Sequence, residues 1–389
     1  MTFENIKLNV APPSTNEIGA AYARLALGLS QKVPGLLNAY VGPEEWLEAI
    51  LAEPPDLLML RHHAEAVATA AQKSQLQRNR KERLLRNVRG LLCLIRVAMG
   101  EQIMFTEQVR MLLDLRARSF RFQGFAEWAT WQATYTMPVT TALPLLSAAV
   151  ESLRERLAAH PFDLETRDLL TQGDMQVVAV EGDGVPFYQQ GQLCVPEQGT
   201  LRVDRLYHLA ARLGYGGTHT MHTAMRQRYA AGEAECAVLL NFGPDQVIVQ
   251  GLYESLLPKL DLYATAIPAL LQAAGLPANA EQLRRIHAAE ELLECSKANA
   301  ALLLHQEKMR SRDVRSYLAR SGLMTRQQAG RLVREVADPL RAAHVFAPLI
   351  GGILIQQWLR NDDHSISALL TDPPVPSRMD RFFHEKQRA

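Results

Sequence analysis

Residues 206–222 read Leu-Tyr-His-Leu-Ala-Ala-Arg-Leu-Gly-Tyr-Gly-Gly-Thr-His-Thr-Met-His, and this stretch decides the expected fold. Residues 206–213 carry side chains that favour a helix. The three glycines within residues 214–217 would end that helix, because glycine adopts the backbone angles found beyond a helix terminus. A second helix is expected to follow, capped by Thr218 or Thr220 through a side-chain oxygen. Two helices joined by a glycine turn indicate a predominantly helical protein.

His219 and His222 lie three positions apart, so both imidazoles would project from one face of the second helix. Two imidazoles on one face can share a metal ion. No glutamate stands between them as in the H-E-x-x-H arrangement of zinc hydrolases. The pattern therefore leaves two interpretations open: a pair of metal ligands, or two structural histidines of which one is buried and hydrogen-bonded.

Helical periodicity continues upstream of this segment. Apolar residues recur every three or four positions and predict one buried stripe at Ile18, Tyr22, Leu25 and Leu29. The pattern is helical from 57 to 115, with an interruption near Gly100. We expect Pro138 and Pro144 to flank a further break, because proline removes a backbone donor, and a helix to follow over 145–159.

The middle of the chain changes character. Short runs rich in β-branched residues, separated by turn residues, predict a small sheet of two to four strands within 175–180, 192–195 and 200–203. Helices resume at Asp204 and continue to about Asn361, and the proline-containing tail from Ser365 is expected to be irregular.

These patterns predict a mostly α, multi-helical fold with a small central β-sheet. An N-terminal helical region would occupy residues 1–165. Residues 166–389 would form the sheet and the remaining helices, and the two regions would make one compact unit.

Composition places the chain among ordinary globular proteins, with 48% hydrophobic and 21% charged residues and a net charge of +1. This balance predicts neither a nucleic-acid partner nor a membrane partner. A basic run interrupted by Glu82 is interpreted as a solvated helix face: Arg78, Arg80, Lys81, Arg83, Arg86 and Arg89.

Several features predict a cytoplasmic protein. Met1–Pro13 lacks the continuous apolar segment of a signal peptide, and the apolar stretch Phe346–Leu354 is too short to span a membrane and predicts a buried helix. Four widely spaced cysteines are interpreted as reduced, mostly buried thiols: Cys93, Cys194, Cys236 and Cys295.

Residues 208–222 are similar, without a gap, to the pattern H-L-V-A-H-E-A-Y-P-G-H-H-T-E-H. Further segments agree in order with Y-V-R-L-A-L, D-A-Y-Y-G-P, V-I-S-E-G-L-A and N-A-A-L-L-L-H, at 22–27, 39–43, 247–252 and 299–305. On these motifs the chain resembles an uncharacterised bacterial family assigned as zinc peptidases, helical and gluzincin-like. The resemblance implies a gluzincin-like peptidase scaffold.

The positions that would carry zinc and catalytic residues are largely replaced. Arg212 and Leu213 stand at the H-E pair, Thr218 at the first histidine of H-H, Met221 at the acid of T-E-H, and Gln250 at the glutamate of S-E-G-L. The resemblance is retained at Tyr215, His219 and His222.

The family motif can be divided in two ways. If H-E, a downstream histidine and a distant glutamate form a gluzincin site, then Arg212, Leu213, Thr218 and Gln250 replace its ligands and base. If H-x-x-E-H forms an inverted site, then Thr218 and Met221 replace a ligand and the base, and His222 survives.

Neither division leaves zinc-hydrolase chemistry intact. A catalytic zinc ion needs about three protein ligands and a carboxylate to take a proton from its bound water. Leu213 and Met221 cannot take a proton, and Arg212 brings a permanent positive charge to the place of the metal. We expect the Arg212 guanidinium to substitute for the metal charge and to hold the old pocket together through nearby polar groups.

Three functions remain as hypotheses. The first is a catalytically inactive zinc-peptidase-like protein without a cofactor, whose cleft takes a peptide, a small molecule or a protein partner. That cleft would be lined by the helix at 205–213, the helix at 218–232 and the segment around Gln250. The second is a metallohydrolase with a rebuilt zinc site, in which His219 and His222 are ligands and the third ligand is His208, Glu233 or Glu235. The third is a metal-free enzyme in which Arg212 binds an anionic substrate group.

Other polar residues are given structural interpretations. His305, in a leucine-rich segment, is expected to be a hydrogen-bonded core histidine, and Glu254 is expected to face solvent. Acidic neighbours would raise the pKa of the Cys236 thiol, which argues against a nucleophile there.

Overall fold

A computed structural model of the chain describes residues 14–121, 132–320, 324–360 and 365–380. Helices account for 68% of the protein, and small sheets of two or three strands complete it. This confirms the expected mostly helical class. No helix within the described ranges is long and apolar enough to cross a membrane. Residues 1–13, on which the prediction about a signal peptide depends, lie outside the described residues.

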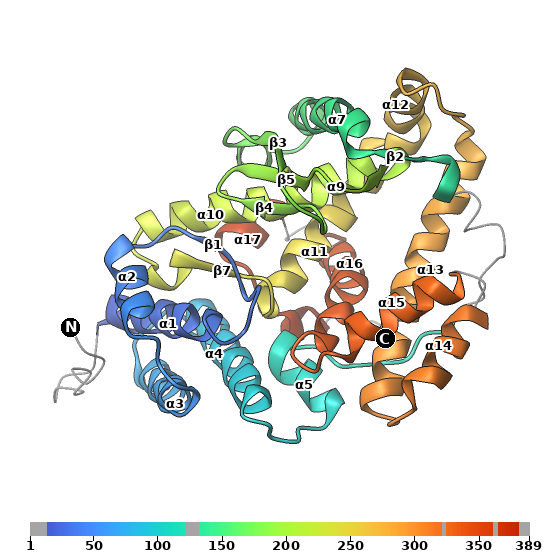
Figure 1. Ribbon diagram of the computed structural model, residues 1–389. Helices are drawn as coiled ribbons and strands as arrows, with labels where there is room; N and C mark the ends of the chain where they lie inside the picture. The colour runs from blue at the N-terminus through green and yellow to red at the C-terminus, as the bar shows by residue number, and fades with distance from the viewer. Residues whose placement is uncertain (1–13, 122–131, 321–323, 361–364, 381–389) are drawn as a thin grey trace, which may run out of the picture.

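The first helices form a block at one end of the molecule, drawn in blue in Figure 1. The apolar stripe predicted from Ile18 onward is buried in the first of them, and Ser14 and Glu17 cap its start reciprocally. The long helical pattern after Leu57 is divided at residues 74–77 as well as near Gly100. The elements of this block are α1 (Thr15–Ser30), α2 (Glu44–Ala52), α3 (Leu57–Lys73), α4 (Arg78–Ala98) and α5 (Phe105–Leu113).

The basic run on α4 does not form a solvated face, so this prediction was wrong. Arg83 is buried and its guanidinium lies 3.0 Å from Glu233, while Arg80 pairs with Glu235 at 2.6 Å. These carboxylates are about 150 positions away in the chain. The sequence pattern of α4 alone therefore could not reveal them.

The strands form three separate small sheets instead of one. β1 (Leu37–Tyr40) pairs antiparallel with β7 (Val238–Leu240), and β2 (Thr136–Pro138) pairs antiparallel with β6 (Thr200–Arg202). The third sheet has the order β3-β5-β4, with β3 parallel and β4 antiparallel to β5. Its strands are β3 (Gln176–Val180), β4 (Phe187–Gln189) and β5 (Gln192–Pro196). In two of the sheets, strands from the first half of the chain pair with strands from the second.

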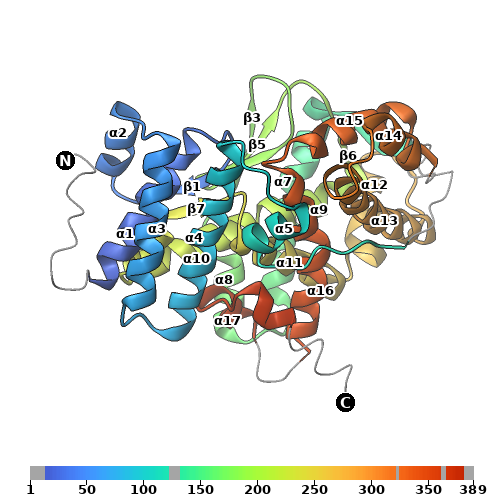
Figure 2. The ribbon, with the colours of Figure 1, turned by 90° about the horizontal axis from the view of Figure 1, so that it is seen from below.

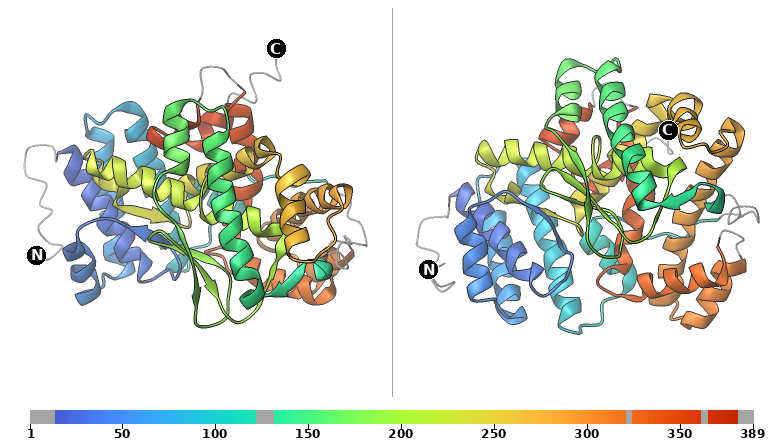
Figure 3. Two further views of the ribbon diagram at one scale, coloured as in Figure 1. Left: turned by 90° about the horizontal axis from the view of Figure 1, so that it is seen from above. Right: turned by 45° about the horizontal axis from the view of Figure 1, so that its top comes forward.

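Two local predictions were wrong. Helix α7 (Val139–Ala159) begins directly after Pro138 and continues through Pro144, which loses one backbone hydrogen bond but does not end the helix. The tail is not irregular throughout, because Ser365 caps α17 (Ile366–Thr371) through its side-chain oxygen. Helix α7 packs on α9 and on strands β3 and β5, above which it lies in Figure 3.

The remaining helices lie beside and beyond the sheets, with α13, α14 and α15 at the end opposite α1–α4 in both Figure 1 and Figure 2. One hydrophobic core cluster contains residues from Ile18 to Met379. These helices are α8 (Leu164–Thr171), α9 (Leu206–Leu213), α10 (Thr218–Ala230), α11 (Pro244–Leu256), α12 (Ile267–Ala273), α13 (Ala280–His305), α14 (Ser311–Arg320), α15 (Arg326–Ala337) and α16 (Phe346–Trp358). The apolar segment from Phe346 is thus a buried helix, as predicted.

Helices α11 and α16 cross in close contact because glycines face each other at the crossing. A Cβ atom on Gly251 would lie 2.3 Å from the Gly351 carbonyl oxygen, and one on Gly351 would lie 2.4 Å from the Val247 carbonyl oxygen. No side chain fits at such distances. The crossing brings Glu254 of α11 against Gly352 of α16, and both residues line a cleft.

Candidate ligand-binding cleft

A cleft of about 930 Å³ lies where α9, α11, α13 and α16 meet. Each of these helices contributes residues spaced three or four positions apart, which is the spacing of one helix face. The polar and charged residues that line the cleft from the first three helices are Arg205, His208, Arg212, Gln250, Tyr253, Glu254, His287, Glu290, Glu291, Glu294 and Lys297. The cleft is therefore strongly polar.

Arg212 lines this cleft from the last turn of α9. Its side chain is half-buried, and its guanidinium makes no hydrogen bond or ion pair with any residue that the structure describes. Only its backbone carbonyl is engaged, as the acceptor of a hydrogen bond from the Thr218 hydroxyl at 3.1 Å. Arg212 thus faces the cleft and not bulk solvent. It does not, however, hold the surrounding polar groups together as expected.

Helix α11 contributes Gln250, Tyr253 and Glu254. The Gln250 amide donates to Gln246 Oε1 at 3.4 Å, and the Tyr253 side chain is only 6% exposed. Glu254 is half-buried and lines the cleft, so the prediction that it faces solvent was wrong. Burial raises the pKa of the Glu254 carboxyl, and the carboxylates of Glu294 and Glu291 add to this, while the Tyr253 side chain and Arg205 oppose it.

The acids of α13 have different surroundings. Glu290 forms an ion pair with Arg202, and Glu294 forms one with Lys297 at 2.7 Å. Arg205, Arg202 and Lys297 lower the pKa of Glu290 against the opposing effect of its burial. Glu291 is largely exposed at the rim. The half-buried acids Glu290 and Glu294 are therefore compensated by protein cations.

His208 lies at the base of the cleft and is 4% exposed. Its Nε2 is 2.7 Å from the Tyr263 hydroxyl, while its Nδ1 is buried without a hydrogen-bond partner. The ring lies 5.5 Å from that of His287, whose Nδ1 also lacks a partner. Burial and the nearby positive charge of Arg205 lower the pKa of His208 well below its usual value, so the imidazole is neutral.

His219 and His222 are brought together elsewhere, on either side of the Tyr188 hydroxyl. Their Nδ1 atoms lie 3.1 Å and 2.8 Å from that oxygen, and His219 Nε2 lies 3.1 Å from the Gln172 carbonyl oxygen. A carbonyl only accepts, so His219 carries its proton on Nε2 and its Nδ1 accepts from Tyr188. His222 Nδ1 must then donate to the same hydroxyl.

This arrangement leaves His222 Nε2 as a buried lone pair without a hydrogen-bond partner. Burial, together with Arg226, lowers the pKa of His222 to about 4, which keeps the ring neutral. Three of the four ring nitrogens of the pair are thus already engaged with protein groups.

The residues present do not fit a zinc ion at either predicted place. His208 lies in the cleft and is not grouped with His219 and His222; Glu233 pairs with Arg83 and Arg228, and Glu235 pairs with Arg80. Within the described ranges there is no group of three or more histidine, cysteine, aspartate or glutamate side chains that could hold a metal ion.

The other residues proposed from the motif do not line the cleft. Tyr215 donates its hydroxyl to the Gly173 carbonyl, Met221 is 2% exposed in the core, and Leu213 and Thr218 are also buried. Neither threonine is the residue at the N-cap of α10, which is Gly217; Thr220 Oγ1 instead accepts from the Gly216 backbone N–H. Helix α10 supplies no lining residue, whereas α13 and α16 do.

The structure also places three residues that were given structural interpretations. His305 Nε2 donates to the Val336 carbonyl at 2.7 Å, and its ring stacks on Phe105, as expected for a hydrogen-bonded core histidine. All four cysteines are free, and Cys295 lines the cleft. Burial raises the pKa of Cys236 to about 12, which agrees with the absence of a nucleophile there.

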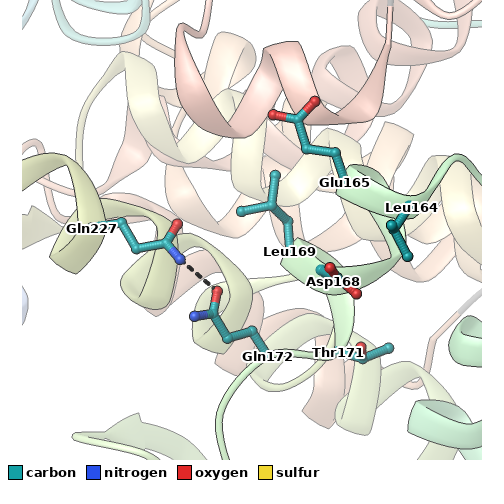
Figure 4. Close-up of a pocket in the computed structure, with 7 residues that line it drawn as sticks. All are labelled: Leu164, Glu165, Asp168, Leu169, Thr171, Gln172 and Gln227. Carbon is teal, nitrogen blue, oxygen red and sulfur yellow. Dashed lines mark hydrogen bonds between the residues drawn. The ribbon is translucent and has the colours of Figure 1, made fainter.

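A second hollow lies between α8 and α10 (Figure 4). There the Gln227 amide donates to Gln172 Oε1 at 2.8 Å, and Glu165 and Asp168 are its charged residues. None of the residues predicted from the motif lines it. The cleft at α9 and α11 is therefore the stronger candidate for a site.

Arg205, Tyr253 and the cleft-lining face of α13 were not predicted from the sequence. The spacing of His287, Glu290 and Glu294 was available as a signal, because it marks one helix face. Whether this face of α13 lines a cleft depends on how α13 packs against the other helices, which the spacing does not show.

No protein-family model matches this chain, and neither a curated protein nor a solved structure matches it.

Proposed function

We propose that this protein is a zinc-peptidase-like scaffold without metallopeptidase activity, whose cleft binds a ligand through an anionic group held by Arg212. One observation carries the proposal. Arg212 and Gln250, which occupy positions of a zinc ligand and of the distant glutamate in the motif resemblance, line the same cleft, and the Arg212 guanidinium has no ion-pair partner among the described residues.

The placement of these two residues favours the gluzincin division of the motif over the inverted one. Under the inverted division the site would centre on Met221 and His222. Met221 is in the core, and His222 is bound to Tyr188 away from the cleft. Under the gluzincin division the replaced positions include Arg212 and Gln250, which do share a cavity.

A guanidinium is suited to anion binding at such a place. It stays protonated, and it presents a planar set of donors that matches a carboxylate or a phosphate through two parallel hydrogen bonds. Arg205, which directly precedes α9, also lines the cleft; it forms no ion pair with the described residues, although the nearby carboxylates of Glu290 and Glu254 raise its pKa. Neutral His208 between them adds no competing charge. Arg212 and Arg205 thus both line the cleft from this side.

Anion binding tests the proposal directly. Isothermal titration calorimetry with acetate, succinate and inorganic phosphate should detect a single site that is lost in Arg212→Gln. Arg284→Gln is the matched control, because Arg284 is an exposed arginine on α13 outside the cleft. Binding that is equal in both variants, or no binding to the wild type, would reject Arg212 as the anion site.

A second experiment tests the scaffold. The combined substitutions Arg212→His, Leu213→Glu, Thr218→His and Gln250→Glu restore the residues of the gluzincin division. The folded variant should then bind close to one zinc per chain, measured by plasma mass spectrometry, whereas the wild type should hold close to none. The matched control restores the inverted division through Thr218→His and Met221→Glu.

Two results would contradict this view. A restored variant that folds but takes up no zinc would show that these positions do not form a zinc site. Zinc in the wild type at one per chain, lost in His219→Ala or His222→Ala, would instead support the rebuilt metallohydrolase.

A further inference from the structure

The cleft contains a negative pole as well as the positive one on α9. Glu254 lines the cleft and forms no ion pair with any described residue, in contrast to Glu290 and Glu294 on the facing helix. A half-buried carboxylate without a counter-charge is costly when ionised, and proteins ordinarily give such a group a cationic partner. At Glu254, Arg205 lowers the pKa of the carboxyl without forming an ion pair, so the place of a direct cationic partner is open.

The side chain of Glu254 is held in place by its neighbours. Glu254 follows Gln250 by one helical turn on the same face of α11. It also packs against Gly352 of α16, because a Cβ atom added to Gly352 would lie 3.4 Å from the Cβ atom of Glu254. The hydroxyl of Tyr253, which is 94% buried, is next to the carboxyl and makes no hydrogen bond to any other residue within the described ranges. Both groups face the cavity.

A separate observation also indicates a ligand. His208 is 96% buried and lines the same cleft, yet its Nδ1 has no hydrogen-bond partner. Buried polar atoms are nearly always hydrogen-bonded, and an exception in a cavity indicates a group or a water molecule that completes the contact. The cleft therefore has an unpaired cation, an unpaired anion and an unsatisfied imidazole nitrogen.

We infer that the ligand of this cleft is zwitterionic, with a carboxylate or phosphate on Arg212 and an ammonium group on Glu254 beside the Tyr253 hydroxyl. The inference rests on the proposed anion site and adds the second charge. An ammonium group is favoured over a metal cation because the described residues offer no three-ligand group for a metal. The raised pKa of the Glu254 carboxyl agrees with this, because burial and the carboxylates of Glu294 and Glu291 together outweigh the opposing effects of the Tyr253 side chain and Arg205.

The test uses the full chain and two matched series of probes. The first series consists of ω-amino acids from glycine to aminohexanoate. The second consists of the alkanoates with the same chain lengths, which lack the ammonium group. Calorimetry on the wild type should show, for the best chain length, affinity about ten- to a hundredfold higher for the amino acid, as expected for one hydrogen bond between charged groups.

Two glutamate variants assign the ammonium site. In Glu254→Gln the preference for the amino acid should disappear, and alkanoate binding should not weaken, because the change removes a negative charge from the cavity that holds the anion. Glu294→Gln is the matched control, because Glu294 lines the same cleft but already pairs with Lys297. That control should keep the preference. Circular dichroism confirms that each variant is folded.

The outcomes separate this inference from the proposed function. Alkanoates that bind as tightly as the amino acids overturn the zwitterion while leaving the anion site in place. A preference that persists in Glu254→Gln overturns the assignment of the ammonium group to Glu254. No binding by either series overturns both the inference and the proposed function.

Discussion

The junction of α4 with residues 228–236 and the cleft between α9 and α11 both contain charged side chains withdrawn from solvent, but the charges are compensated differently. At the junction, Arg83 and Arg228 both bind Glu233, at 3.0 and 2.7 Å. In the cleft, Arg212 and Glu254 form no ion pairs with the described residues, although they face one cavity.

This difference separates charges that stabilise the fold from charges that are available for binding. Breaking a buried ion pair leaves an uncompensated charge and strongly destabilises a protein. Removing a charged side chain that has no ion-pair partner leaves no other charge uncompensated, so it should cost little stability. The same residue types should therefore give opposite results in the two regions.

The largest effect is expected for Glu233→Ala at the junction. This change removes the shared carboxylate of two buried guanidiniums, so the free energy of unfolding should fall by about 3–5 kcal/mol. Urea denaturation followed by circular dichroism measures it. The matched change in the cleft, Glu254→Ala, should cost far less. Equal losses in the two variants would remove the distinction between the regions.

As the pH falls, protonation of a cleft histidine should reduce stability before the ion pairs of the junction are lost. Burial lowers the pKa of His287 to about 4, so the unfolded chain, with a histidine pKa of about 6.5, takes up the proton first. The contribution of His287 to stability is complete above pH 6.5 and is lost as the pH falls towards 4. With each pKa unit worth about 1.4 kcal/mol, the difference between about 6.5 and about 4 amounts to about 3 kcal/mol in total.

The variant His287→Gln should therefore lose less stability than the wild type over this range, as measured by urea denaturation at successive pH values. The junction should still be paired there, since the pKa of Glu233 is lowered from its usual value by Arg228 and Arg83, against its burial. An unchanged pH dependence in the variant would show that His287 is not neutral in the folded protein.

The crossing of α11 and α16 provides a third test, directed at the cleft alone. Gly251→Ala places a methyl group 2.3 Å from the Gly351 carbonyl oxygen, so the helices must separate at a cost of about 1–3 kcal/mol. Thermal unfolding checks the loss, and anion binding should weaken with it. Gly330→Ala on α15 is the control. Its nearest neighbour would be 3.6 Å away, and higher helix propensity should stabilise it by up to about 1 kcal/mol.

The smallest effect on stability is expected for Arg212→Gln, within about 0.5 kcal/mol of the wild type, because no ion pair is lost. Arg83→Gln changes the same residue type at the junction and should cost several times more, since Arg83 is 5% exposed and bound to Glu233. Urea denaturation of the two variants compares them. A large loss in Arg212→Gln would mean that this guanidinium supports the fold.

The sequence predicted the helical class and the division of residues 206–222 correctly because these depend on local patterns. Apolar spacing places α1 and α16, and the glycines after Leu213 separate α9 from α10. Proline was less reliable: Pro144 lies inside α7, where packing against α9 and the strands maintains the helix. The strands at 176–180 and 192–196 were predicted, but not their distribution over three sheets.

At the candidate site, the motif selected Arg212 and Gln250, which do share a cleft, together with four residues that do not line it. Helical spacing put His219 and His222 on one face, and the structure confirms this through their common contact with Tyr188. A rebuilt zinc site would also need a third ligand. Helical spacing says nothing about whether His208 lies near the other two histidines, because His208 belongs to a different helix.

The sequence by itself determined where the helices begin and end and which residue types occupy the motif, because both depend on neighbours within a few positions. Only the tertiary structure decided which charges are compensated. Arg83 and Glu233 are 150 positions apart, and the cleft is formed by helices from residue 205 to residue 356. Whether a charged side chain forms an ion pair depends on packing between residues that are far apart in the chain. Local sequence patterns do not show which of these residues come into contact.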